Sequence, residues 1–118
     1  MYLVDTNIII YYLEGQSDVV SFFREHRGKL AISPITWMET LSYDFTQEQE
    51  QIVRSFLAGF KMINISASIM EIAVSVRKQK KIKLPDAIIA ATAIEQGSVL
   101  VTRNQRDFKG AVSLIVNL

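Results

Sequence analysis

The 118-residue chain contains no cysteine, only two prolines and five glycines, and a single histidine. The absence of cysteine excludes disulfide bonds and thiolate metal sites, and it fits the reducing cytoplasm, where we expect the protein to reside. The sequence also offers no Ser–His or Cys–His pair that would supply a nucleophile. Covalent catalysis by such a pair is therefore not expected.

No apolar run approaches the ~18 residues of a membrane-spanning helix. No basic segment precedes the apolar stretch at the N-terminus, so we expect neither a signal peptide nor association with a membrane. The apolar fraction of 49% is enough for one sizeable core, and the length predicts a single domain over residues 1–118.

The net charge of +1 is unevenly distributed along the chain. Residues 1–76 carry five basic and nine acidic side chains, whereas residues 77–118 carry eight basic and three acidic ones. This asymmetry indicates a polyanionic partner for the basic part. On charge alone, a solvated helix face explains it equally well.

Uniformly apolar segments predict five short strands, at residues 2–4, 29–33, 61–65, 99–102 and 112–116. Helices are predicted to start within residues 8–13 and to cover residues 19–27, 35–43 and 46–59, residues 67 onward into a basic run, and residues 85–96. Predicted caps are Ser17 or Asp18, Thr46, Ser66 and Gly97. This alternation predicts a three-layer α/β/α sandwich with a mostly parallel, about five-stranded sheet.

Four acidic residues lie where predicted strands end or a predicted helix begins. Asp5 follows the first strand, Glu39 lies about one helical turn beyond the second, and Asp107 lies in the loop after the fourth. Asp86 is in the first turn of the last helix. Because ligands of open α/β sheets bind beyond the carboxyl ends of the strands, we expect these side chains to share one crevice. Oxygen ligands of this kind suit Mg²⁺ or Mn²⁺.

Each acid also has a structural interpretation. The helix dipole would stabilise Asp86, Asp107 suits a turn, and Glu39 suits an exposed helix face. Asp5 is the hardest to explain in this way. A carboxylate between two buried segments costs free energy unless it is paired, hydrogen-bonded or bound to a cation. The joint pattern therefore favours a functional site.

Four segments resemble, in order and spacing, the motifs of the PIN-domain family: MYLVDTNIII, the glutamate of SPITWMETLSY, LPDAIIAATAIEQG and VLVTRNQRDF. Within this family the chain is similar to VapC-type ribonuclease toxins. The resemblance implies an endoribonuclease that depends on Mg²⁺ or Mn²⁺ and cuts single-stranded or structured RNA. It also implies a homodimer that is bound by a cognate antitoxin.

By position, the resemblance implies that the catalytic and metal-binding residues are Asp5, Glu39, Asp86 and Asp107. Asp5 and Asp86 are expected to be the primary ligands, with Glu39 and Asp107 completing the shell or acting as base. Many relatives have Asp where this chain has Asn104. Whether Asn104 or Asp107 fills the fourth position, and whether one or two metal ions bind, therefore stays open.

Polar neighbours of these acids match positions that orient the acids in the family. They are Thr6, Asn7 and Thr102, and Asn104 is expected to support the acids in the same way.

Basic residues flank the acids on both sides and are predicted to contact RNA phosphates. They are Arg77, Lys78, Lys80, Lys81, Lys83, Arg103 and Arg106. The alternative for the run RKQKKIK is a helix C-terminus, where cations are stabilised. Trp37, Phe22 and Phe23 are able to stack on bases, but their spacing favours the core or a dimer surface.

Other functions remain open. A PIN-like module that binds RNA or protein without catalysis is one alternative, and a housekeeping nuclease is another. A phosphoacceptor receiver domain is disfavoured because it needs adjacent acids after the first strand. A D-x-D phosphatase would need an acid at Asn7.

An open acidic crevice in a nuclease calls for control by a protein inhibitor. The apolar residues of the N-terminal helices are predicted to pair subunits and to form a groove for an amphipathic antitoxin helix, unless they only fill the core. These residues are Tyr11, Tyr12, Leu13, Phe22 and Phe23. The inhibitor is expected to place an Arg or Lys among Asp5, Glu39 and Asp86.

Overall fold

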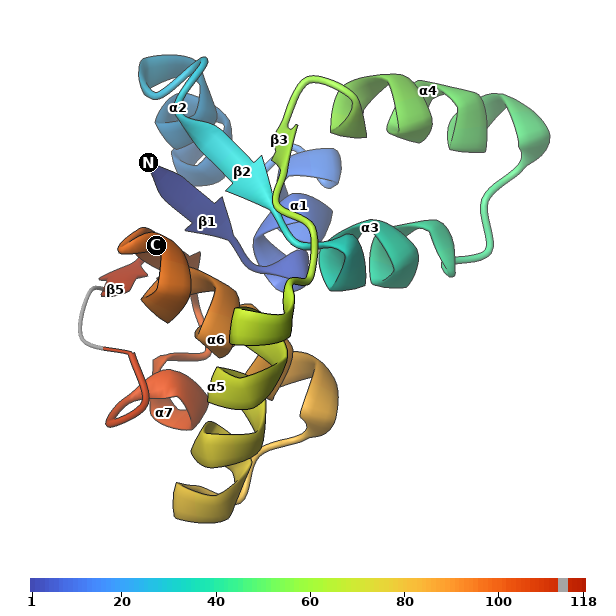
Figure 1. Ribbon diagram of the computed structural model, residues 1–118. Helices are drawn as coiled ribbons and strands as arrows, with labels where there is room; N and C mark the ends of the chain where they lie inside the picture. The colour runs from blue at the N-terminus through green and yellow to red at the C-terminus, as the bar shows by residue number, and fades with distance from the viewer. Residues whose placement is uncertain (113–114) are drawn as a thin grey trace.

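The computed structural model describes residues 1–112 and 115–118. The strands are β1 (Tyr2–Val4), β2 (Leu30–Ile32), β3 (Lys61–Met62), β4 (Val99–Thr102) and β5 (Ile115–Asn117) (Figure 1). The helices are α1 (Thr6–Leu13), α2 (Ser17–Glu25), α3 (Pro34–Leu41), α4 (Gln47–Leu57), α5 (Ala67–Gln79), α6 (Leu84–Gln96) and α7 (Gln105–Phe108). The strand order is β3-β2-β1-β4-β5, and every pairing among the described strands is parallel.

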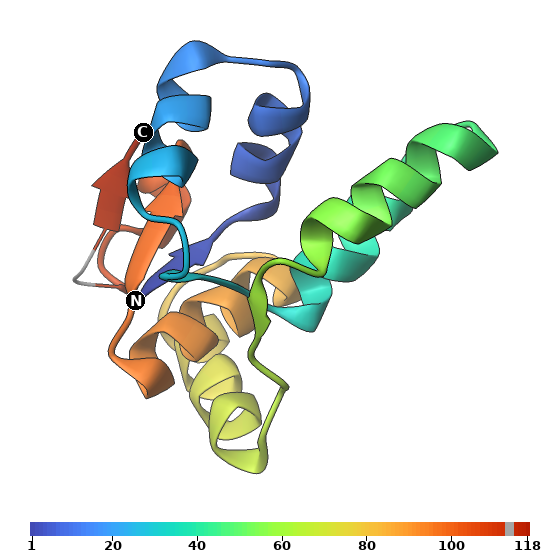
Figure 2. The same ribbon diagram turned by 90° about the horizontal axis from the view of Figure 1, so that it is seen from above.

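The sheet separates two apolar cores. Leu3 and Leu100 enter the core formed with α5 and α6, whereas their neighbours Val4 and Val101 enter the core formed with α1, α2 and α4. In Figure 2, α1 and α2 lie on one side of the strands and α5 and α6 on the other. Successive residues of a strand point to opposite faces, so both faces of the central strands are buried. The predicted three-layer sandwich is confirmed.

Helices α3 and α4 lie side by side and extend away from the sheet in both views (Figures 1 and 2). Thr46 caps α4 as predicted, because its hydroxyl accepts a hydrogen bond from the Gln49 N–H while the Gln49 side chain accepts one from the Thr46 N–H. The predicted cap at Gly97 is also confirmed, with a left-handed φ of 61° that favours glycine.

Several predicted boundaries are wrong. Helix α1 begins at Thr6 rather than within residues 8–13, because the Asp5 side chain accepts a hydrogen bond from the Thr6 N–H and starts the helix earlier. Helix α2 begins at Ser17, so neither Ser17 nor Asp18 precedes it as a cap; Gln16 occupies that position.

Differences at the ends of the other elements are smaller. Helix α3 begins at Pro34 and ends at Leu41, and β3 covers only two residues. Asp107 lies in the short helix α7 rather than in a loop. The fifth predicted strand, residues 112–116, falls partly outside the described residues, and β5 begins at Ile115.

Among residues 1–112 and 115–118, no helix is both long enough and apolar enough to cross a membrane. This finding agrees with the absence of long apolar runs in the sequence.

Candidate active site

A pocket of about 380 Å³ opens at the carboxyl ends of β1 and β4. Strand β1 lies at the centre of the sheet, between β2 and β4, at the point where the chain order reverses. Such switch points are where α/β sheets bind their ligands. The pocket is lined by Asp5, Thr6, Asn7, Glu39, Tyr43, Lys83, Pro85, Asp86, Asn104 and Asp107. All four predicted acids therefore line one pocket, although they come from four separate segments.

Asp5 is almost fully buried, with 5% of its surface exposed. Its Oδ1 accepts a hydrogen bond from the Thr6 N–H (2.8 Å), and its Oδ2 accepts one from the Thr102 hydroxyl (2.8 Å). Burial raises the pKa of Asp5 to about 6, these hydrogen bonds oppose the rise, and the charges of Asp86 and Glu39 add to it. Asp5 is therefore a carboxylate whose charge the protein alone does not balance.

Glu39 reaches the pocket from the second turn of α3. Its Oε1 accepts a hydrogen bond of 2.6 Å from the Thr6 hydroxyl, and a bond of 3.2 Å joins the hydroxyls of Thr6 and Thr36. Thr6 thus contacts Asp5 through its backbone and Glu39 through its side chain. Its predicted position beside the acids fits these contacts, and a change at Thr6 would disturb both carboxylates.

Asp86 lies in the first turn of α6, as predicted, and is half-buried. Burial raises its pKa, the charges of Glu39 and Asp107 raise it further, and the nearby Lys83 opposes the rise. These interactions connect all four acids electrostatically, because Asp86 also acts on Asp5.

The side chains of Asn104 and Asp107 are hydrogen-bonded to each other. The Asn104 side-chain amide donates a hydrogen bond of 2.8 Å to Asp107 Oδ2, and both residues line the pocket. The Asn104 N–H donates to the Thr102 hydroxyl (2.9 Å), the same hydroxyl that donates to Asp5. A continuous chain of hydrogen bonds therefore runs from Asp5 through Thr102 and Asn104 to Asp107.

The donor set fits a hard divalent cation in its chemistry. Every acidic ligand offers oxygen, and the mutual repulsion that raises the pKa of Asp86 would be relieved by a cation. The side chains do not yet enclose such an ion. In the part of the chain that the structure describes, no three His, Cys, Asp or Glu side chains come together closely enough to hold a metal.

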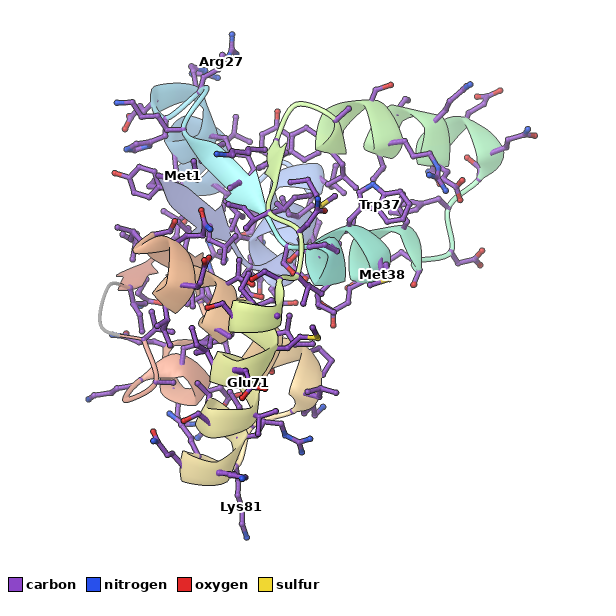
Figure 3. All side chains as sticks on the ribbon, in the orientation of Figure 1. Met1, Arg27, Trp37, Met38, Glu71 and Lys81 are labelled. Carbon is purple, nitrogen blue, oxygen red and sulfur yellow. The ribbon has the colours of Figure 1, made fainter. Side chains whose placement is uncertain are left out.

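The predicted RNA-binding residues have different surroundings. Lys83 lines the pocket. Lys80 instead donates hydrogen bonds to the backbone carbonyls of Arg106 and Lys109, and Arg77 Nε donates to the carbonyl of Ile82. Lys78, Lys81 and Arg106 are exposed, and Lys81 projects away from the body of the molecule (Figure 3).

The guanidinium of Arg103 contacts several other parts of the protein. Its guanidinium forms a salt bridge with Asp18 (2.7 Å), donates to the Gln16 side chain (2.6 Å) and donates to the Leu118 carbonyl (2.6 Å). It also lies over the ring of Tyr11, at 4.3 Å from the centroid. Arg103 therefore joins the start of α2 to the segment that leads into Asn104.

Replacing Arg103 with alanine should lower the free energy of unfolding by about 1–3 kcal/mol, because several hydrogen bonds from a charged group are lost. The measurement is the urea midpoint. The control is Arg106→Ala, which removes an exposed arginine three residues away and should change stability by less than about 0.5 kcal/mol. Equal midpoints for the two variants would contradict this role.

The aromatic residues considered for base stacking lie in the core. Phe23 is buried, Phe22 is half-buried, and Trp37 lies between α3 and α4 beneath the Arg54 side chain (Figure 3). The aromatic ring that lines the pocket is that of Tyr43, which the sequence analysis missed. Its position four residues after Glu39, one helical turn away, is the signal that would have found it.

The protein is a parallel α/β/α sandwich with four acidic side chains around a pocket at the switch point of its sheet. An acidic pocket of this kind suits phosphodiester chemistry. The PIN domain model matches residues 2–112, and the chain belongs to the PIN-domain family. It is 30% identical over 124 residues to Ribonuclease VapC2 of Haemophilus influenzae, with 96% of this chain and 93% of that protein covered.

Solved structures agree with this placement. The protein is similar to a chain of a toxin-antitoxin complex from Klebsiella pneumoniae, with a TM-score of 0.89, 41% sequence identity, and coverage of 98% of this chain and 96% of that one. It is also similar to a chain of VapBC2 from Rickettsia felis, solved bound to a DNA fragment from its promoter. That match has a TM-score of 0.85 and 26% identity, and it covers 99% of this chain and 98% of the other.

Proposed function

We propose that this protein is a divalent-metal-dependent endoribonuclease of the cytoplasm and the toxin of a toxin–antitoxin pair. The observation that carries the proposal is the meeting of Asp5, Glu39, Asp86 and Asp107 in one pocket at the switch point of the sheet. Full-length likeness to a protein named as a VapC ribonuclease supports the same activity.

Each pocket residue would have a separate role in phosphodiester hydrolysis. Asp5 and Asp86 would hold Mg²⁺ or Mn²⁺, which when bound neutralises the phosphate and supplies an activated water. Glu39 and Asp107 lie in the same pocket as oxygen acceptors and would accept the proton of the attacking water. Lys83, also in the pocket, would bind a phosphate oxygen through its ammonium group.

Thr6, Thr102 and Asn104 would fix the orientation of these acids through the hydrogen bonds described above. Asn7 is exposed within the pocket and would contact the substrate or a water molecule.

We further propose that an antitoxin helix occupies a second pocket, of about 430 Å³, between α2 and α4. Tyr12, Val20 and Phe56 contribute apolar lining, and Arg24 and Arg27 contribute positive charge. This composition suits an amphipathic helix with acidic residues on its flank. The similar chain from Klebsiella pneumoniae was solved in a toxin-antitoxin complex, which supports such a partner.

Of the five apolar residues predicted for partner surfaces, most pack within the molecule. Phe23 is buried against Tyr12, with ring centroids 4.9 Å apart, and Phe22 packs on Tyr2 at 5.3 Å. Tyr12 and Phe23 also line the second pocket. For a homodimer, exposed Met70 and Val74, one turn apart on α5, supply apolar surface.

The test uses an RNA oligonucleotide blocked at both ends. The purified protein should cut it internally, whereas the complex with the product of a small neighbouring reading frame should not. Val20→Glu places a charge in the second pocket and should abolish the complex, so that co-expression no longer protects growth. Sizing of the free protein and of the complex reports the subunit number.

A matched control is Ile52→Glu, which introduces the same charge at an exposed position on α4. This variant should still form the complex. The antitoxin proposal fails if Val20→Glu, folded by circular dichroism, binds the neighbouring gene product as the wild type does.

A further inference from the structure

Tyr43 is an exposed aromatic residue in a pocket whose other lining side chains, apart from Pro85, are all polar or charged. Half of its surface, 50%, is accessible to solvent. An aromatic ring that a protein leaves exposed beside a polar site can bury apolar surface against a ligand. Neither hydrolysis nor metal binding, as proposed above, uses this ring.

The backbone holds Tyr43 in a defined position just beyond α3. The Tyr43 N–H donates to the Thr40 carbonyl (3.3 Å), and the Tyr43 carbonyl accepts a hydrogen bond from the Phe45 N–H (3.0 Å). The Tyr43 ring also packs on the ring of Phe45, with centroids 6.1 Å apart and planes at 26°. Since Phe45 is itself half-buried against the α1–α2–α4 core, the Tyr43 ring has a fixed support.

The pocket contains two kinds of chemistry side by side. Glu39, four residues before Tyr43 in the chain, is one of the acids, and Lys83 supplies a cation for phosphate. These groups suit contacts with the sugar–phosphate backbone of a nucleic acid. None of them offers a flat apolar surface to a base, whereas the ring of Tyr43 does.

We propose that Tyr43 forms a nucleobase-binding subsite, in which its ring stacks on the base next to the scissile phosphate and selects single-stranded RNA. This inference rests on the proposed ribonuclease function and names the form of its substrate. In a duplex the faces of each base are covered by its neighbours, so an aromatic ring gains no stacking surface there. Stacking tolerates any base, so the subsite would select an unpaired nucleotide rather than a sequence.

The experiment measures RNA binding in the Asp86→Asn background with Mg²⁺ present, so that cleavage does not interfere. The probe is a mixed-sequence single-stranded RNA oligonucleotide with a fluorophore, followed by anisotropy. Tyr43→Leu removes the ring but keeps an apolar side chain, and it should weaken binding about 5- to 100-fold. Tyr43→Phe keeps the ring and should bind within about twofold of the parent.

Two controls separate stacking from a general loss of structure. Ile52→Ala shortens an exposed apolar side chain that does not line the pocket and should leave the affinity unchanged. When the same RNA is annealed to its complement, the Tyr43→Leu and Tyr43→Phe proteins should bind it equally. In the active protein, Tyr43→Leu should raise KM for the single strand and change kcat little.

The outcomes distinguish this inference from the proposed function. If the wild type cleaves RNA but Tyr43→Leu binds the single strand as well as Tyr43→Phe does, the subsite is overturned and the nuclease stands. If binding depends on the ring but the wild type does not cleave RNA, Tyr43 still stacks on an unpaired base and the ribonuclease proposal fails. Equal losses of affinity in Tyr43→Leu and Tyr43→Phe would also overturn stacking, because the effect would then come from the hydroxyl group that both variants lack.

Discussion

Replacing Asp86 with asparagine should reduce RNA cleavage by at least about a hundredfold while the protein stays folded. Asp86 is half-buried, and repulsion from Glu39 and Asp107 contributes to its raised pKa. The amide keeps the shape of the side chain but removes a charge from this group of acids, so the metal-free protein should be as stable as the wild type or more stable. The measurements are the initial rate of cleavage and the thermal midpoint.

The matched control is Asp44→Asn, the same substitution at an exposed acid near the pocket that does not line it. This variant should cleave RNA at the wild-type rate. Persistence of wild-type activity in Asp86→Asn, purified free of contaminating nuclease, would remove Asp86 from the mechanism.

Asp5→Asn should abolish cleavage as well. Its effect on the free energy of unfolding is the sum of two opposing changes, the loss of a buried charge and the loss of a hydrogen bond. The folded-state pKa of about 6 lies above the ordinary 3.8, so the ionised form costs the folded protein roughly 3 kcal/mol above pH 6. This cost is absent below about pH 4 and grows as the pH rises to about 6. Asparagine removes the cost, but it cannot accept hydrogen bonds on both atoms, as Asp5 does from Thr6 and Thr102.

Removal of divalent cations should abolish cleavage, and Mg²⁺ or Mn²⁺ should restore it, because the pocket offers oxygen ligands of high charge. Cation binding should also raise the melting temperature of the wild type, since the ion binds the folded state. As the pH falls below about 6, Asp5 gains a proton and the apparent affinity for the cation should fall. The stabilisation should be absent in Asp5→Asn.

The melting temperature reports cation binding independently of catalysis, so the two measurements test separate points. Full activity in excess chelator would point to metal-independent acid–base cleavage by the same carboxylates. A melting temperature that does not respond to Mg²⁺ or Mn²⁺ at neutral pH would argue against cation binding by the pocket.

The sequence predicted that the four acids share one pocket, because their proximity follows from the geometry of a parallel sheet. The carboxyl ends of parallel strands lie on one edge of a sheet, so Asp5 after β1 and Asp107 after β4 had to approach each other. The apolar strands also predicted burial on both faces, which the two cores confirm. Whether these acids perform catalysis stays a prediction for the variants above.

Contacts between distant segments explain what the sequence did not reveal. The sequence alone does not show which protein groups a basic residue contacts. The partners of Arg103 come from α2 and from Leu118, which lie far from it or at the end of the chain. The early start of α1 has a local cause instead, because the Asp5 side chain accepts a hydrogen bond from the N–H of the next residue. Tyr43 was not predicted as a site residue, because apolar periodicity does not show which ring a pocket leaves exposed.

The hydrogen bond between Asp5 and Thr102 spans 97 positions of the chain. During synthesis from the N-terminus, β1 leaves the ribosome long before β4 does, and at about 5–20 residues per second the interval is roughly 5–20 s. Throughout this interval Asp5 lacks its hydroxyl donor, and Asp107, which follows Thr102 in the chain, has not yet been made. It follows that the pocket is completed only late in translation, after β4 and the segment that carries Asp107 have been made.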